Sequence, residues 1–120
     1  MDTVKTEKYY RELGFDSLCS CDSCRNYYKE IKGAYPVLSE YLSGMGVDIG
    51  KPFEAMPLDP YEGTIEYIAV QYIVMGNASD FERADVSGVH IGIADSHPCT
   101  DIDEEHFVIE IRPIKLKWTV

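Results

Sequence analysis

The sequence lacks any long apolar segment. Among its 120 residues no run approaches the roughly 18–20 consecutive apolar residues that a membrane-spanning helix needs. Residues 1–10 are polar and lack the apolar core of a secretion signal. We therefore expect a cytoplasmic protein that has no membrane partner.

Basic residues are also scarce. The chain has 11 Lys and Arg residues against 21 Asp and Glu residues, which gives a formal net charge of −10. Such a field repels nucleic-acid phosphates, and the one basic stretch, Arg112–Lys117, is too short to reverse it. We expect no nucleic-acid partner. An acidic protein can instead neutralise a basic protein partner, as immunity and inhibitor proteins do, and this is one alternative function.

Several motifs of enzymes are missing. The chain has no G-x-S-x-G nucleophile turn, and its only G-x-G, Gly44–Gly46, follows a predicted helix and not a strand. The stretch 95–106 combines carboxylates with histidines but lacks the glycine of a calcium-binding loop, so we interpret it as a solvated loop. His90 falls inside a predicted strand, where packing is its expected role. These absences favour a non-enzymatic protein.

What the sequence does contain is a cluster of thiols. Three of its four cysteines fall within six residues, in the order C-x-C-x2-C. Two thiolates at C-x2-C spacing can share one tetrahedral zinc ion, and a cysteine or histidine from the distant stretch 95–106 would complete a ligand set that suits Zn²⁺. The ligands predicted for this structural zinc site are Cys19, Cys21, Cys24, Cys99 and, as a substitute, His97.

Two other interpretations of the cysteines stay open. Cys21 and Cys24 stand at the predicted start of a helix, where backbone N–H groups favour a thiolate, so they could form a redox pair. Against this, the motif does not follow a strand of a parallel sheet, and the Asp22 carboxylate is expected to raise the thiol pKa. The cysteines could also be plain thiols, since cysteine packs as a small apolar residue.

The first part of the chain shows helical periodicity. Residues 46–62 contain three prolines and no sustained period, which predicts irregular structure, and their apolar side chains predict that this segment packs on the core. Apolar spacing predicts helices over residues 3–13, 24–34 and 37–45, with Asp22 or Ser23 as the N-cap of the second and Pro36 near the first turn of the third.

The second part of the chain is rich in β-branched and aromatic residues. Its first predicted strand is apolar at both alternating sets of positions, with Ile65 and Tyr67 on one face and Val70 and Tyr72 on the other. This pattern predicts a central strand that is covered on both sides. The predicted strands are residues 64–75, 86–94, 106–112 and 114–120.

Helices that precede strands favour an α+β fold over a βαβ sheet. We predict two or three N-terminal helices packed on a three- to four-stranded, mainly antiparallel sheet, in a single domain of residues 1–120. Residues 1–46 would form its helical part with the cysteine cluster, and residues 63–120 its sheet part. The expected function is that of a non-enzymatic binding protein with a protein partner. The doubly apolar strand and the tyrosine-rich helices also allow a homodimer.

Overall fold

The computed structural model describes all 120 residues and has an α+β architecture, as predicted. Three α-helices precede a six-stranded antiparallel sheet, so the predicted count of three to four strands is too low. That the chain forms one domain stays a prediction. None of the helices is long and apolar enough to span a membrane. The elements are α1 (Thr3–Glu12), the short 3-10 helix η1 (Phe15–Ser17), α2 (Asp22–Ala34), α3 (Pro36–Ser43), β1 (Glu54–Pro57), β2 (Thr64–Met75), β3 (Ala84–Val86), β4 (Val89–Ile93), β5 (His106–Arg112) and β6 (Ile114–Lys117).

The two strands that the sequence did not predict have clear local causes. β1 forms in the segment expected to be irregular because it pairs with β2, where Phe53 N donates to Gln71 O at 2.8 Å. The predicted strand 86–94 is instead a hairpin of β3 and β4. Ser87 and Gly88 make its turn with φ values of 55° and 78°, the left-handed region that a tight two-residue hairpin turn requires.

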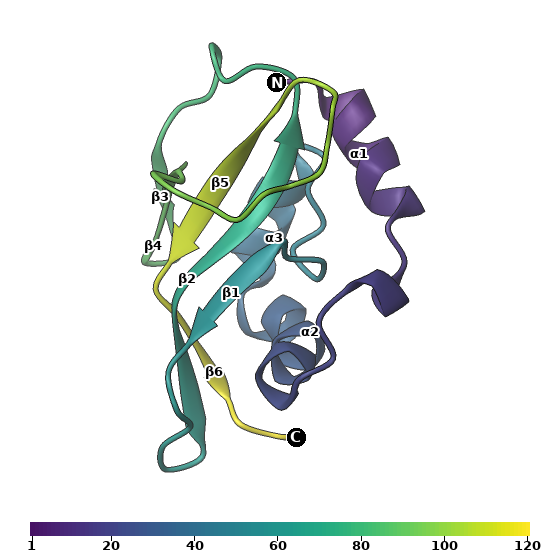
Figure 1. Cartoon of the computed structure of the whole chain (residues 1–120). Helices are drawn as coiled ribbons and strands as arrows, with labels where there is room; N and C mark the ends of the chain where they lie inside the picture. Colours follow the sequence, from purple (N-terminus) through teal and green to yellow (C-terminus); the bar gives the residue numbers. More distant parts are fainter.

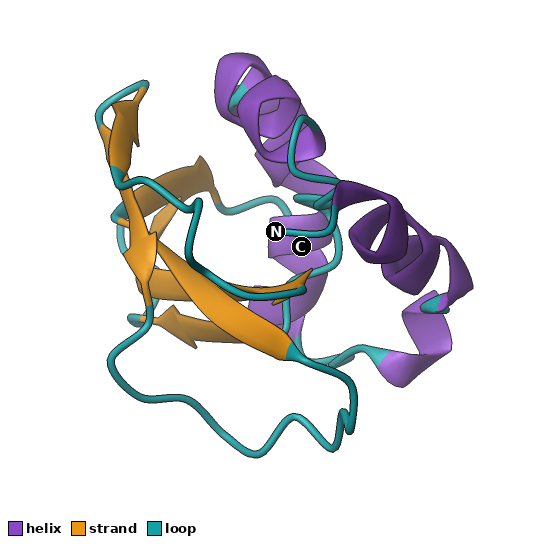
Figure 2. Cartoon of the chain, turned by 90° about the horizontal axis from the view of Figure 1, so that it is seen from above, coloured by secondary structure: helices purple, strands orange, loops and turns teal.

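The sheet is built around β2. The strand order is β1-β2-β5-β4-β3, and β6 pairs with β2 next to the end of β5. Figure 2 shows that the helices gather on one side of the sheet. A core cluster that includes buried residues from α2, α3, β2, β5 and β6 fills the space between them. The segment after α3 also packs there, as predicted, through Val47 and Ile49.

β2 changes the face it presents to the helices partway along its length. Ile65 and Tyr67 lie in the same core cluster as Val70 and Tyr72, although strict alternation places these pairs on opposite faces. The pairing with β1 explains the change, because Met56 faces Ala69 while Pro57 faces Tyr67. Ile68 is therefore an extra residue in a bulge, and its side chain is 51% exposed. The predicted division of β2 into two faces is wrong for this reason.

Both faces of β2 are nevertheless covered along its second half, as predicted. Val70, Tyr72 and Val74 pack toward the helices, while Ile73 and Met75 belong to a smaller cluster on the other face. That smaller cluster also contains Ala94 and Val108 and packs against Tyr9, Phe53 and Ile102. The long loop after β4 therefore helps to cover the sheet.

α1 completes the edge of β2 where β1 ends. Figure 1 shows α1 beside this part of the strand. The Tyr10 hydroxyl donates to Ile73 O at 2.7 Å and accepts from Ile73 N at 3.0 Å. Thr6 Oγ1 accepts from Met75 N at 3.0 Å, and Asp2 N donates to Met75 O at 2.8 Å. Helix groups thus take the hydrogen bonds that a further strand would have made.

α2 does the same for the outer edge of β6. The Tyr35 hydroxyl, just past the end of the helix, accepts from Lys115 N at 3.1 Å and donates to Lys115 O at 3.3 Å. The Asn26 amide donates to Lys117 O and accepts from Thr119 N, both at 2.8 Å. These contacts attach α2 to the last strand and blunt an edge that would otherwise be open.

Tyr10→Phe tests the attachment of α1. The substitution keeps the packing of the ring but leaves the buried N–H and C=O of Ile73 without a partner. We expect it to lower the free energy of unfolding by about 1–3 kcal/mol in urea titrations. Tyr41→Phe is the matched control, because the Tyr41 side chain is 39% exposed, and it should change stability by no more than about 0.5 kcal/mol. Equal stability of the two variants would contradict this role of Tyr10.

Candidate metal centre

The three clustered cysteines converge at the start of α2. Cys19 follows η1 in the chain, Cys21 is the N-cap residue of α2, and Cys24 lies in its first turn. Their Sγ atoms all lie within 4.8 Å of one another. Cys19 and Cys21 are exposed, and Cys24 is half-buried. This is the arrangement that the C-x-C-x2-C spacing predicts, and the group could hold a metal ion.

The helix begins earlier than the sequence predicts. Asp22 or Ser23 is the predicted N-cap, but both residues lie inside the helix, and Cys21 takes the cap position with an extended backbone (φ −66°, ψ 162°). Asp22 instead pairs with Arg25 one turn along. Because the cap residue is a cysteine, its sulfur lies close to the unpaired N–H groups of the first helical turn.

Two tyrosines hold the backbone of the cysteine motif. The Tyr28 hydroxyl donates to Cys19 O at 2.7 Å, and the Tyr67 hydroxyl of β2 donates to Ser23 O. Burial raises the pKa of Tyr67 to about 12, so this phenol keeps its proton at neutral pH. The motif is thereby fixed to α2 on one side and to the central strand on the other.

The environment shifts the pKa values of the two thiols of the C-x2-C pair in opposite directions. The backbone N–H of Cys24 lowers the pKa of the Cys21 thiol, and this effect outweighs partial burial. Burial raises the pKa of the Cys24 thiol, and its neighbours Cys21 and Cys19 add to the rise. The prediction that Asp22 raises the thiol pKa is wrong for Cys21, because the donors at the start of α2 decide the direction.

The structure does not bring the other two predicted ligands into this group. Cys99 is exposed, and its Sγ lies 3.4 Å from Asp101 Oδ1. His97 is exposed in the same loop, with its ring centroid 6.4 Å from that of Phe53 in an edge contact. Whether either residue ligates a metal ion stays a prediction.

The acidic stretch around them behaves as a loop with internal contacts. His106 uses both ring nitrogens locally, with Nε2 at 2.7 Å from Thr100 Oγ1 and Nδ1 at 2.7 Å from Glu104 O. The carboxylates and histidines of this stretch form no second group with metal-binding geometry. His90 lies in β4, as predicted, with Nδ1 at 3.2 Å from Asp85 Oδ1.

An apolar pocket, which no pattern in the sequence predicts, borders the cysteine cluster. Its volume is about 210 Å³, and Cys19 and Cys24 line it on one side. The rest of the lining comes from α1, from the loop after it, from α2 and from residues 52–55, which include the start of β1, because these parts of the chain come together here. Prominent among these lining residues are Tyr9, Leu13, Tyr28, Phe53, Glu54 and Ala55.

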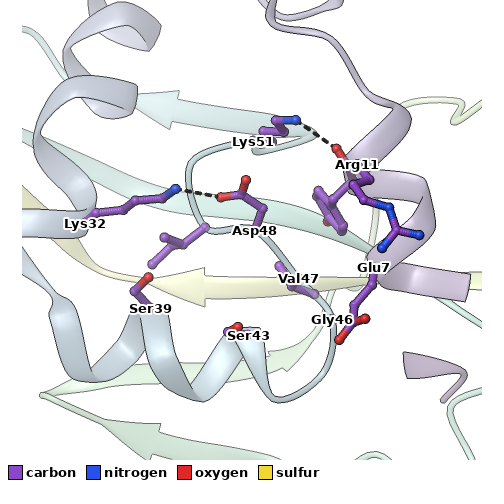
Figure 3. A pocket seen from close by; sticks show the side chains of 11 residues that line it. Glu7, Arg11, Lys32, Ser39, Ser43, Gly46, Val47, Asp48 and Lys51 are labelled. Atoms are coloured by element: carbon purple, nitrogen blue, oxygen red, sulfur yellow. Dashed lines mark hydrogen bonds and ion pairs between the residues drawn. The ribbon is translucent and has the colours of Figure 1, made fainter. Parts of the chain in front are cut away.

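A larger and more polar cleft, of about 490 Å³, lies where the three α-helices meet the segment after α3 (Figure 3). Several of its charged groups already have partners. Lys32 Nζ lies 3.3 Å from Asp48 Oδ1, and Lys51 Nζ donates to the carbonyl oxygens of Tyr10 at 2.8 Å and Leu13 at 2.7 Å. These contacts fix residues 46–51 against α1 and α2, so the cleft lies at a structural junction of the fold.

The pKa shifts predict different reactivities for the cysteines of the metal-free, reduced protein. Because the thiolate is the nucleophile, iodoacetamide should modify Cys21 before Cys24 near neutral pH. A lowered pKa gives Cys21 more thiolate at a given pH, so its rate of modification should rise with a midpoint at a lower pH than that of an ordinary thiol. Peptide mass spectrometry measures both rates, and faster modification of Cys24 would contradict the assigned directions.

Comparisons with models of protein families, with curated proteins and with solved structures found no match for this chain. The function must therefore be argued from the site itself.

Proposed function

We propose that this protein is a small acidic binding protein in which Cys19, Cys21 and Cys24 hold a structural Zn²⁺ ion. The observation that carries the proposal is the convergence of the three Sγ atoms within 4.8 Å. Thiolates are soft ligands, and a cluster of them suits zinc better than calcium or magnesium. Zinc sites whose ligands are mostly cysteines commonly stabilise a fold without taking part in a reaction.

The surroundings of the cluster support a structural role. Residues 14–22 contain no buried side chain, so this loop has little apolar surface of its own to order it. A bound ion would fix the loop to the first turn of α2, and the free energy of binding would then contribute to folding. The hydrogen bonds from Tyr28 and Tyr67 hold the motif in place before an ion binds.

The loop between β4 and β5 is the part of the chain that could supply a fourth ligand. Cys99 and His97 are the residues of that loop with suitable donor atoms, and either would tie the cysteine loop to the sheet half of the chain. Binding of a basic protein partner and formation of a homodimer are further proposals, and they depend on the charge of −10 and on the tyrosine-rich helices.

A thiol redox protein is the second candidate. Its support is the position of the Cys21 and Cys24 sulfurs, which lie within 4.8 Å at the start of α2, together with the opposite pKa shifts of these two thiols. In this function Cys21 would attack a disulfide of a substrate, and Cys24 would resolve the mixed disulfide. This candidate requires a reducible bond between the two sulfurs and no metal.

Elemental analysis of protein purified without a histidine tag tests the first candidate. We expect about one zinc per chain, and Cys21→Ser should lower that content sharply because it removes a ligand. Free zinc at roughly 100 times its Kd should raise the free energy of unfolding by about 2.7 kcal/mol. Ser20→Ala, between two of the cysteines, is the matched control and should keep the metal.

Two outcomes would contradict the zinc site. If all four cysteines titrate freely in a metal-free protein, no chelate exists. If the protein contains no metal and oxidation links Cys21 to Cys24, the redox function replaces the structural zinc site as the proposed function. Cys99→Ser and His97→Ala, measured in the same way, show whether the loop after β4 contributes a ligand.

A further inference from the structure

The pocket beside the cysteines lies where a fourth ligand could reach the proposed ion. A tetrahedral ion that is held by three sulfurs has one more coordination position. Cys19 and Cys24 border the pocket of about 210 Å³ as well as supplying two of those sulfurs. A small group inside the pocket would therefore be next to the ion.

The negative charge around the proposed ion favours a neutral donor as its fourth ligand. One Zn²⁺ ion with three thiolates carries a net charge of −1, and the chain as a whole carries −10. Glu54 also lines the pocket and has no ion-pair partner within 4.0 Å. A fourth thiolate or a carboxylate would add negative charge to this environment, which costs electrostatic free energy.

The residues that line the pocket favour a ligand with a flat aromatic ring and one polar edge. Tyr9, Tyr28 and Phe53 supply aromatic walls, against which a planar ring packs well. The Glu54 carboxylate could accept a hydrogen bond from the ring, as carboxylates commonly do from metal-bound imidazole. From these features we infer that the fourth ligand of the ion is a neutral imidazole nitrogen that occupies this pocket, and this inference rests on the proposed metal site.

An imidazole could come from two sources. One is a free small molecule that carries the group. The other is His97 of this chain, whose ring contacts Phe53, one of the residues that line the pocket. In the second case the loop after β4 would have to move so that the His97 ring enters the pocket beside Phe53 and reaches the sulfurs. The ligand chemistry is the same in both cases.

Cobalt(II) and cadmium substitution can separate these sources. Untagged wild-type protein and His97→Ala are each loaded with Co²⁺, and free imidazole is titrated in. If added imidazole changes the cobalt absorption bands of the wild-type protein in a saturable way, a free molecule is the source of the ligand. A band change caused by His97→Ala and reversed by free imidazole identifies His97. In either case, cadmium NMR with labelled imidazole or labelled histidine should show scalar coupling between the metal and a ring nitrogen.

Three variants test whether the pocket holds the ring. Ala55→Phe fills the pocket and should abolish the imidazole response, whereas Met56→Phe, at the next position of β1 and outside the lining, should leave it unchanged. Glu54→Ala removes the proposed acceptor and should weaken imidazole binding roughly tenfold. All three variants should keep the sulfur-to-cobalt charge-transfer band, because the cysteines are intact.

The failures of the two proposals are distinguishable. If no sulfur-to-cobalt charge-transfer band appears in any variant, the metal site itself is absent. If the band appears but neither His97→Ala nor free imidazole changes the spectrum, the inference of an imidazole ligand is wrong. A four-sulfur spectrum that Cys99→Ser converts to a three-sulfur spectrum would also overturn it.

Discussion

The positions of α1 and α2 depend on the hydrogen bonds that the open backbone edges of the sheet require. β2 runs beyond the end of its partner β1, so the N–H and C=O groups of Ile73 and Met75 need other partners. Tyr10, Thr6 and the backbone of Asp2 provide them from α1. Because an unpaired buried backbone group is costly, this requirement fixes where α1 lies against the sheet. Tyr35 and Asn26 fix α2 against β6 in the same way.

These two attachments determine the position of the cysteine loop. The segment between α1 and α2 joins one helix fixed at the edge of β2 to another fixed at the edge of β6. It has no buried side chain of its own, and it is held at two carbonyl groups by Tyr28 and Tyr67. The three sulfurs thus converge in a loop whose two flanking helices are both attached to the sheet. An ion bound there would stabilise the least buried part of the helical half.

The sequence predicted those features that depend on local pattern. Helical spacing located the three helices, the apolar run located β2, and the C-x-C-x2-C spacing predicted the sulfur cluster. Features that depend on distant contacts were missed. β1 exists because β2 is available to pair with it, and the bulge at Ile68 follows from that pairing. The pocket between the cysteines and Phe53 could not be seen, because three separate segments form it.

The central claim is that Cys19, Cys21 and Cys24 together bind one zinc ion. X-ray absorption at the zinc edge of the zinc-loaded, untagged protein tests it most directly, because the spectrum counts the sulfur atoms around the metal. The account predicts three sulfur atoms at about 2.3 Å and one nitrogen at about 2.0–2.1 Å. A shell of oxygen and nitrogen atoms without sulfur would show that the cysteines do not hold the ion, and would contradict the account.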